Sequence, residues 1–541
     1  MLIAVALLAG LLGGLVHSSH TTSHILPRSA VVDLGYGQYQ GVSLYNSVDE
    51  YLGIRYAKAP LDNLRFRAPQ YPENSSAIQD ASSFGPICIG VGQSTGDDSL
   101  SEDCLFINVW RPNNASSNAS LPVWMFIQGG GYADLSNANY NGSEVVKQSG
   151  HDIVFVNFNY RVGVLGFLAS EDVRQDGDLN AGLLDQRMAM KWVNQYIHLF
   201  GGNPNHVVIH GDSAGAGSVA LHLTAYGANN TGLFVGAVAE STFWPTQRTV
   251  AEMEFQYKQF VEDVGCEKET HKLTCLRGTD LNVIQKYNVQ KPFPGGSDSP
   301  LPLWYFLPVV DGDLVPDQLY NLFDQGKFIH VPMIVSDDNN EGTDFAYNAA
   351  NEAEVAQFMK NNYPGLNETD LANITQTYPL MDALPEHEAY FPSAAAAYGE
   401  ATFTCPGNQM ASSIQNFSSN RVWNYRFNIQ DPTEISKGMG VPHVFELPAI
   451  FGVGDTNEPT YSYADSNANI IPITMDYYLS FIKCLNPNTF RNEKAPEWKS
   501  WGSGRGQRLK LQTNSTAMEE VPEAQTKRCL LWQQLSASME H

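Results

Sequence analysis

The sequence predicts an α/β fold in which helices cover both faces of a mostly parallel central sheet. Three short apolar runs, at 121–128, 153–159 and 206–210, have the composition of buried strands. Apolar residues at helical spacing occur at 181–200 and again from 216 to 223. Strands that are apolar along their whole length and alternate with helices are typical of parallel sheets buried on both faces.

The composition indicates one large domain. Apolar residues make up 43% of the 541 residues and charged residues only 16%, so the chain can form a large core. No stretch is rich enough in Pro, Gly or Ser to divide the chain, and no internal repeat occurs. Residues 345–413 are helical and polar in pattern, as expected of a helical insertion packed over the sheet. We therefore expect a single domain at 20–541.

The net charge argues against a nucleic-acid-binding protein. The 57 acidic and 32 basic side chains give a formal charge of −25. Such a surface repels phosphate backbones and anionic lipid headgroups. The charge favours solubility and identifies neither a substrate nor an oligomeric state.

The first residues have the pattern of a cleaved signal peptide. The apolar run 2–16 is short for a membrane span and is followed by small polar residues, although no basic residue follows Met1. No later run reaches membrane-spanning length. We therefore expect a signal peptide at 1–19, a secreted protein and no stable membrane anchor. Nine Asn-x-Ser/Thr sequons suggest a glycoprotein; they begin at Asn74, Asn114, Asn118, Asn141, Asn229, Asn367, Asn373, Asn416 and Asn514.

Residues 211–215, GDSAG, match the G-x-S-x-G pattern of a nucleophile elbow. They lie directly between the strand-like HVVIH and the helix-like AGSVALHL, which makes the match far more specific than the pentapeptide alone. The turn of such an elbow is so sharp that only glycine fits on both sides of the serine. Ser213 is therefore the predicted nucleophile, and a structural Gly/Ser turn is the alternative.

A serine nucleophile needs a histidine base and a carboxylate that orients the base. In the α/β-hydrolase fold these residues follow in the order nucleophile, acid, histidine. Glu341, in the polar segment SDDNNEGT, and His443, in the loop GVPHVFEL, satisfy this order. Spacing alone gives His443 little weight among 13 histidines. Three other carboxylates compete with Glu341, namely Asp337, Asp338 and Asp344.

A glycine-rich turn offers donors for an oxyanion. QGGGY at 128–132 follows the strand-like LPVWMFI, and consecutive glycines leave backbone N–H groups free of side chains. Gly130, Gly131 and the N–H of Ala214 are the expected donors. A phosphate loop is excluded because no G-K-[ST] follows, and the chemistry requires neither a metal nor an organic cofactor.

The sequence resembles the type-B carboxylesterase/lipase family, which includes the cholinesterases, and in particular secreted carboxylesterases of the fungal type. The resemblance covers nearly the whole chain after the signal peptide. It rests on the ordered motifs YLGIRYAKAP, LRFRAP, SEDCLFINVWRP, GGG, NYRVGVLGF, GLLDQRMAMKWV, FGGNPNHVVIHGDSAGAGS, NNEGT and GVPHVFELPAIFG. It implies a Ser213–His443–Glu341 triad and favours Glu341 over the aspartates.

The resemblance also implies structural features away from the triad. It implies two ion pairs, Arg65 with Glu102 and Arg161 with Asp185. The seven cysteines lack paired C-x-x-C spacing, which favours disulfides and one free thiol over a zinc site. Cys88–Cys104 and Cys266–Cys275 would close short loops, the family implies Cys405–Cys529, and Cys484 is expected to be free and buried.

The expected activity is hydrolysis of small, short-chain esters. Gln128 and Tyr132 beside the glycines, and Trp304 at the family's acyl pocket, are the candidate pocket residues; a core tryptophan is an equally good reading of Trp304. The segment 89–103 contains neither the tryptophan of cholinesterases nor the amphipathic lid of lipases. A lipase or sterol esterase is the main alternative, and a binding protein without catalysis is a second.

Overall fold

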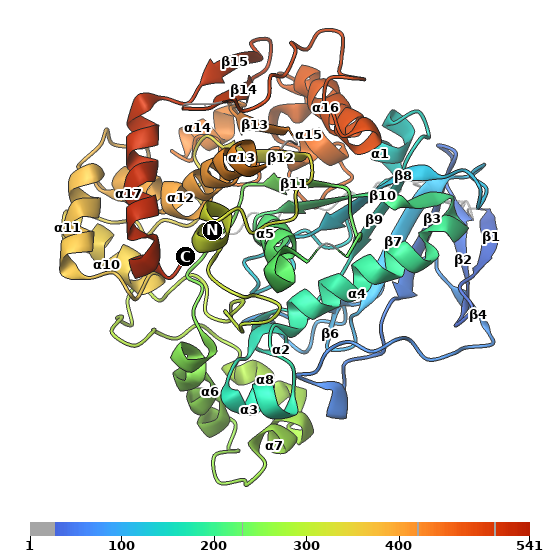
Figure 1. Ribbon diagram of the computed structural model, residues 1–541, viewed down its shortest axis with the longest axis horizontal. Coiled ribbons are helices and arrows are strands. Elements are labelled where there is room, and N and C mark those ends of the chain that lie inside the picture. The colour runs from blue at the N-terminus through green and yellow to red at the C-terminus, as the bar shows by residue number, and fades with distance from the viewer. Residues whose placement is uncertain (1–26, 230, 419–420, 503–504) are drawn as a thin grey trace, which may run out of the picture.

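A mixed sheet of 13 strands runs through the computed structural model, which describes residues 27–229, 231–418, 421–502 and 505–541 (Figure 1). The expected signal peptide at 1–19 lies outside the described residues. In spatial order the strands are β1 (Arg28–Asp33), β2 (Gln38–Ser43), β3 (Val48–Arg55), β7 (Phe106–Pro112), β9 (Val154–Phe158), β8 (Leu121–Ile127), β10 (Gly202–Asp212), β11 (Gly236–Glu240), β12 (Met333–Asp338), β13 (Val422–Phe427), β14 (Gln507–Leu511) and β15 (Ala517–Glu520), with β4 (Ile78–Asp80) beside β2.

The centre of the sheet is parallel and its edges are antiparallel. Neighbouring strands from β9 through β8, β10, β11, β12 and β13 to β14 all pair in parallel. The N-terminal strands β1, β2, β3 and β7, and the last strand β15, pair in antiparallel fashion. This arrangement confirms the predicted α/β-hydrolase fold with a mostly parallel sheet.

Both faces of the central strands are buried, as the continuous apolar runs predict. In β8, Met125 belongs to one hydrophobic cluster, and its neighbours Trp124 and Phe126 belong to the cluster on the other face. Successive side chains of a strand point to opposite faces, so a strand covered on both sides must be apolar throughout. Helices α4 and α5 lie on one side of the sheet, and α1 and α16 on the other (Figure 1).

The helices follow the predicted pattern, including several between 352 and 417. Their bounds are α1 (Ser143–Gln148), α2 (Gly163–Phe167), α3 (Glu171–Asp176), α4 (Ala181–Tyr196), α5 (Ala214–Ala228), α6 (Val250–Asp263), α7 (Lys272–Gly278), α8 (Leu281–Tyr287), α9 (Leu319–Asp324), α10 (Glu352–Asn362), α11 (Glu368–Thr377), α12 (Phe391–Gly399), α13 (Cys405–Phe417), α14 (Pro432–Ser436), α15 (Leu447–Phe451), α16 (Ile471–Cys484) and α17 (Glu523–Met539).

The predicted cross-links are present. Disulfides join Cys88 to Cys104, Cys266 to Cys275 and Cys405 to Cys529. Cys484 is free, but the prediction that it is buried is wrong, because its side chain is exposed. It is the last residue of α16, where the helix ends and its apolar face no longer meets the core.

Both predicted ion pairs are buried. Arg65 and Glu102 form two hydrogen bonds of 2.5 and 2.7 Å. The Arg161 guanidinium donates two hydrogen bonds of 2.7 Å to Asp185, and the exposed fractions of the Arg161 and Asp185 side chains are 2% and 0%.

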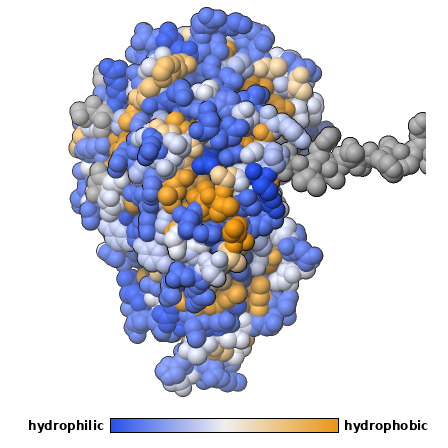
Figure 2. Space-filling model, turned by 90° about the vertical axis from the view of Figure 1, so that its right-hand side faces the viewer, coloured by the Kyte–Doolittle hydropathy of each residue, from blue (hydrophilic) through white to orange (hydrophobic). Residues whose placement is uncertain are grey.

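The surface is largely hydrophilic on the side of the N-terminal strands (Figure 2), where hydrophobic residues form a group near the middle of the view. Exposed apolar side chains of these strands include Val31 and Ile78, which are 41% and 56% exposed. Of the helices in the described ranges, none is long and apolar enough to cross a bilayer.

Candidate active site

Ser213 lies at a sharp turn between β10 and α5. The strand ends at Asp212, the helix begins at Ala214, and Ser213 has a left-handed φ of 52°. A Cβ atom on Gly211 would lie 2.1 Å from the Gly215 carbonyl oxygen, and one on Gly215 would lie 1.9 Å from that of Ile127. Glycine is therefore required on both sides of Ser213, which is the geometry of a nucleophile elbow.

Ser213, Glu341 and His443 all follow the carboxyl ends of strands in the parallel part of the sheet. Ser213 follows β10 and Glu341 follows β12, with β11 between these strands, and His443 lies in the connection after β13. Because parallel strands end at the same edge of the sheet, residues far apart in the sequence meet there.

Among the four candidate carboxylates, Glu341 is the partner of His443. Its Oε2 lies 2.5 Å from His443 Nδ1, and its Oε1 accepts the backbone N–H of Asp338 at 2.7 Å. Both side chains are buried. His443 Nε2 is also buried and has no hydrogen-bond partner within the described part of the chain, which leaves this atom free to accept a proton.

The three aspartates occupy different places. Asp337 and Asp338 belong to β12, so the strand extends into the segment expected to be a loop. Asp337 lies 3.7 Å from Arg508, and Asp338 accepts the backbone N–H of Phe445 at 3.2 Å. Asp344 is close enough to His443 for its negative charge to raise the pKa of the histidine.

Two residues that the sequence did not single out as site residues hold the Glu341 and His443 loops together. Asn340 donates its backbone N–H to the Val441 carbonyl at 2.9 Å and accepts the Val441 N–H on its side chain at 3.0 Å. The Thr343 hydroxyl donates to the Met439 carbonyl at 2.8 Å. The family motif NNEGT contains both residues, but its spacing gives no signal for contacts across about 100 positions.

Hydrogen bonds to Gln128 and Gly129 fix the glycine turn, and the N–H groups of the next two glycines have no acceptor among the described residues. Asn137 accepts the Gly129 N–H at 3.1 Å, and Tyr160 donates its hydroxyl to the Gln128 carbonyl at 2.8 Å. Gly130 and Gly131 have left-handed φ angles of 111° and 62°. Their N–H groups make no hydrogen bond to any described residue, which suits donors for an oxyanion.

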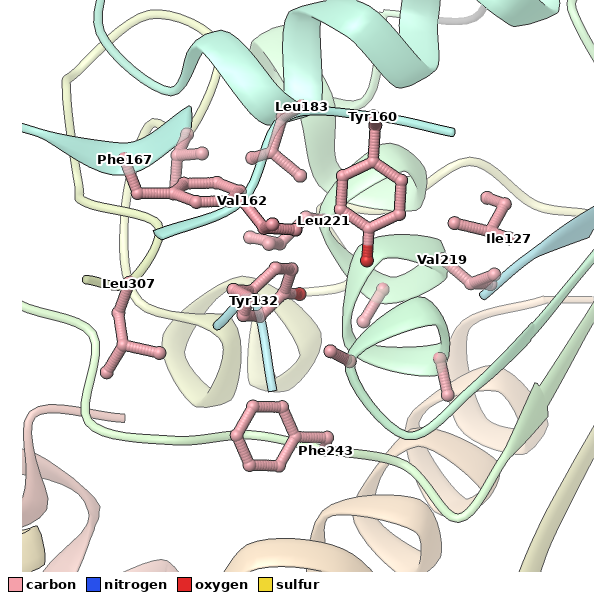
Figure 3. Packing of buried hydrophobic residues seen from close by; sticks show 14 of the residues in the cluster. Ile127, Tyr132, Tyr160, Val162, Phe167, Leu183, Val219, Leu221, Phe243 and Leu307 are labelled. Atoms are coloured by element: carbon pink, nitrogen blue, oxygen red, sulfur yellow. The ribbon is translucent and has the colours of Figure 1, made fainter. Parts of the chain in front are cut away.

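Two of the three predicted pocket residues instead support this turn. The Gln128 amide donates to the Phe158 carbonyl and the Asn159 side chain at 2.8 and 3.0 Å. The Tyr132 ring is buried in the core, where it packs against Phe167 and Phe243 (Figure 3). Both side chains therefore contact the scaffold around the turn, and a role for Gln128 and Tyr132 in the substrate pocket stays a prediction.

Trp304 lies against the glycine turn. A Cβ atom on Gly131 would lie 2.0 Å from the Trp304 ring, so the indole packs directly on this glycine. The Trp304 Nε1–H donates to the Tyr398 hydroxyl at 2.9 Å, which fixes the ring orientation. Trp304 is thus placed beside the candidate oxyanion donors.

Further aromatic rings continue from Trp304 to His443. The Phe345 ring centroid is 5.8 Å from that of Trp304 and 5.0 Å from that of His443. The Phe403 centroid is 4.3 Å from that of His443. Phe403 belongs to a π-helical segment, Glu400–Thr404, that joins α12 to α13. Such segments often occur at functional sites, but no pattern in the sequence indicated this one.

Burial controls the ionisation of the Glu341–His443 pair. Loss of solvent penalises the charged form of each group, which lowers the pKa of His443 and raises that of Glu341. The charges of Asp344 and Glu446 partly oppose the change at His443. The histidine is therefore neutral at neutral pH, the state needed in a general base.

The sequence and structure are similar to those of known enzymes. Residues 28–532 match the carboxylesterase family. The chain is 30% identical to "Secreted lipase 4" of Gibberella zeae over 92% of each chain, and 30% identical to "Lipase 2" of Geotrichum candidum over 83% of this chain and 86% of the lipase. The crystal structure of Aspergillus niger EstA superimposes with a TM-score of 0.93 at 59% identity, covering 95% of this chain and 99% of EstA.

A match over nearly all described residues, together with the elbow and the buried Glu–His pair, leads to one assignment. The chain belongs to the carboxylesterase family of α/β-fold hydrolases.

Proposed function

We propose that this protein is a secreted serine esterase that hydrolyses short-chain carboxylic esters through an acyl-enzyme. The observation that carries the proposal is the hydrogen bond between Glu341 and His443 Nδ1, which leaves the buried Nε2 atom without a partner among the described residues, at the edge of the sheet where Ser213 lies. Relatives described as secreted, such as "Secreted lipase 4" and "Secreted lipase 1" of Botryotinia fuckeliana, support export.

The reaction proceeds in two halves. His443 Nε2 takes the Ser213 hydroxyl proton while Ser213 Oγ bonds to the ester carbonyl carbon. The resulting oxyanion accepts hydrogen bonds from the backbone N–H groups of Gly130, Gly131 and Ala214. Collapse breaks the bond to the alkoxy oxygen, and the alcohol leaves with the proton from His443. Water then attacks the acyl-enzyme by the same route and releases the carboxylic acid, while Glu341 holds the histidine tautomer.

Fluorophosphonate labelling tests the nucleophile directly. We expect one label per chain, and peptide mapping should locate it on Ser213, because an elbow serine beside a neutral histidine is the activated hydroxyl. A chain that resists labelling while folded would support the alternative of a binding protein without catalysis.

The preference for small soluble esters is supported by the loop between Cys88 and Cys104. Residues 92–99 of this loop, which are exposed except for the half-buried Gln93, contain only Gly, Gln, Ser, Thr and Asp. The loop is fixed by Gln285, which donates to the carbonyls of Gly90 and Gln93, and by the Gly92 N–H, which donates to the Asn288 carbonyl at 2.8 Å. A polar loop tied down in this way offers no apolar face to an oil surface.

We expect acetyl to hexanoyl p-nitrophenyl esters to be hydrolysed faster than palmitoyl esters, because Trp304, Phe345 and Phe403 limit the space beside the oxyanion turn. Trp304→Ala should increase the relative kcat/KM for octanoyl and decanoyl esters. Tyr398→Phe is the matched control, since it removes the hydrogen bond to Trp304 and keeps the ring. An unchanged chain-length profile in Trp304→Ala would show that this ring does not limit the acyl group.

A lipase is the second candidate, because relatives at 30% identity are described as lipases. The two functions differ in their response to an interface. We expect no increase in rate when an ester exceeds its solubility, and faster turnover of emulsified triolein than of soluble butyrate esters would favour the lipase.

The acid limb of the pH profile follows from the burial of His443. Neutral His443 is the active form, and burial lowers its pKa to about 4. We therefore expect kcat/KM to fall on the acid side with a midpoint below the ordinary histidine pKa of about 6.5. Asp344→Asn should move the midpoint only slightly to lower pH: the Asp344 charge raises the pKa of His443, but burial raises the pKa of Asp344 itself to about 6, so this charge is mostly lost at the midpoint. Circular dichroism at each pH controls for unfolding, and a midpoint above 6.5 would contradict the expectation.

A further inference from the structure

An open groove of about 400 Å³ lies between α13 and α17, apart from the reaction site. The disulfide between Cys405 and Cys529 joins the two helices and forms part of the groove wall. Ser213, Glu341 and His443 do not line this groove. The proposed reaction therefore leaves the groove without a role.

One face of each helix forms the walls of the groove. Side chains three, four and seven positions apart lie on the same face of a helix. The lining residues with this spacing are Gln409, Ser412, Ser413 and Asn416 on α13, and Thr526, Cys529, Leu530 and Gln533 on α17. The side chain of Asn416 therefore leaves α13 on the groove side of the helix.

Asn416 is also the first residue of a glycosylation sequon. Asn416, Phe417 and Ser418 have the pattern Asn-x-Ser, and Asn416 is exposed, as the attachment of a sugar requires. A sugar linked to Asn416 begins at the groove wall, so its innermost rings lie next to the other lining side chains.

Two glutamines offer hydrogen-bond acceptors on the groove walls. The Gln409 amide donates to Asp324 and, at 3.3 Å, to Ser413. The Gln533 amide donates to Asp324 at 3.3 Å. Asp324 thus orients both amide groups, and the side-chain carbonyl oxygens of Gln409 and Gln533 accept no hydrogen bond from any described residue. Both side chains are only half-buried, so these oxygens can accept hydroxyl groups of a ligand.

Two exposed apolar side chains lie beside these polar groups. Phe417 and Leu530 are 48% and 50% exposed, and both line the groove. Exposed apolar groups that are rimmed by polar side chains are typical of binding surfaces. A sugar ring has hydroxyl groups at its edge and an apolar C–H face, and this combination matches the two kinds of side chain.

The charges of the groove favour a neutral ligand over an ion. Its charged side chains are Asp324 and Arg505, one of each sign. Asp324 accepts the two glutamine amides, and Arg505 is paired with Glu520. Neither charge is left over for an ionic ligand.

We propose that Asn416 carries an N-linked glycan that folds back into this groove. Its innermost sugars cover Phe417 and Leu530 and donate hydroxyl groups to the carbonyl oxygens of Gln409 and Gln533. The inference rests on the proposed export of the protein, because N-glycans are added to exported chains, and it is independent of the hydrolase activity.

The rate at which an endoglycosidase cuts the glycan tests its position. The full chain is secreted from yeast behind a host signal peptide, and glycopeptide mass spectrometry should find sugar on Asn416. Endoglycosidase H cuts between the two innermost sugars. On the folded protein, we expect it to cut at Asn416 at least about tenfold more slowly than at the exposed sequon residues Asn118 and Asn373, which lie outside the groove. Denaturation should remove the difference.

Gln533→Ala tests the contact between the glycan and the groove. The variant loses one acceptor, so cutting at Asn416 on the folded protein should become several-fold faster. Gln534→Ala is the matched control, because Gln534 is the next residue of α17, is exposed, and lies outside the groove. An Asn416 without sugar, cutting at Asn416 as fast as at the exposed sequons, or equal rates in the two glutamine variants would overturn the proposal.

Discussion

Ser213→Ala is expected to lower kcat/KM for short-chain esters by at least about 10⁴-fold while the protein stays folded. The alanine side chain fits the elbow, so the strand, the helix and the two glycines keep their contacts. The acyl-enzyme cannot form without the hydroxyl, and the residual rate then comes from the oxyanion donors and substrate binding alone. Initial rates with p-nitrophenyl acetate, together with circular dichroism, measure both parts of this expectation.

Three further variants test whether the loss of activity is specific to the catalytic serine and its base. His443→Ala should cause a loss of similar size, and the double variant should lose little more, because nucleophile and base act as a unit. Ser218→Ala is the matched serine control: Ser218 is buried on the same helix, but its hydroxyl donates to the Ala214 carbonyl at 2.9 Å. A folded Ser213→Ala protein with near-normal activity would exclude the proposed mechanism.

Asp185→Ala is expected to lower the free energy of unfolding by about 3–5 kcal/mol. Asp185 is fully buried and accepts three hydrogen bonds from Arg161, two from the guanidinium and one from the backbone at 3.1 Å. Its removal leaves the positive charge of Arg161 in the core without a counter-ion. Urea denaturation followed by tryptophan fluorescence measures the change.

A surface pair of similar chemistry separates the effect of burial from that of pairing. Arg174 and Glu171 lie 3.2 Å apart, but their side chains are 41% and 57% exposed. Glu171→Ala should therefore cost less than about 1 kcal/mol. In the core, Arg161→Met combined with Asp185→Leu should recover much of the stability lost in Asp185→Ala, because no unpaired charge remains. Equal losses for Asp185→Ala and Glu171→Ala would show that burial adds nothing.

The nucleophile could be read from the sequence because its signal is local. The pattern GDSAG, a strand before it and a helix after it all fall within a few residues, and the glycine requirement is a backbone property. The alternation of apolar strands and helices predicted the sheet for the same reason. Near the ends of elements this reasoning is weaker: β12 extends through Asp337 and Asp338, and the exposed Cys484 lies where α16 leaves the core.

The partner of His443 could not be chosen from the residues alone. Asp337, Asp338, Glu341 and Asp344 have the same chemistry and lie within eight positions. The family resemblance favoured Glu341, and the structure gives the physical reason. Asp337 lies near Arg508, and Asp338 accepts a hydrogen bond from the Phe445 backbone N–H. Glu341 lies in the turn beyond the strand, where its carboxylate contacts Nδ1 of His443.

The fold class, the elbow serine and the glycine turn could all be predicted from the amino-acid sequence, because each depends on periodicity or backbone conformation over a short stretch. Contacts between distant parts of the chain are visible in the tertiary structure alone: Glu341 meets His443 across 102 positions, and Trp304 packs on Gly131. It also placed Gln128 and Tyr132 in contact with the scaffold around the glycine turn. These contacts depend on how strands distant in the chain are ordered in the sheet, and this order is fixed by packing of the whole core rather than by neighbouring residues.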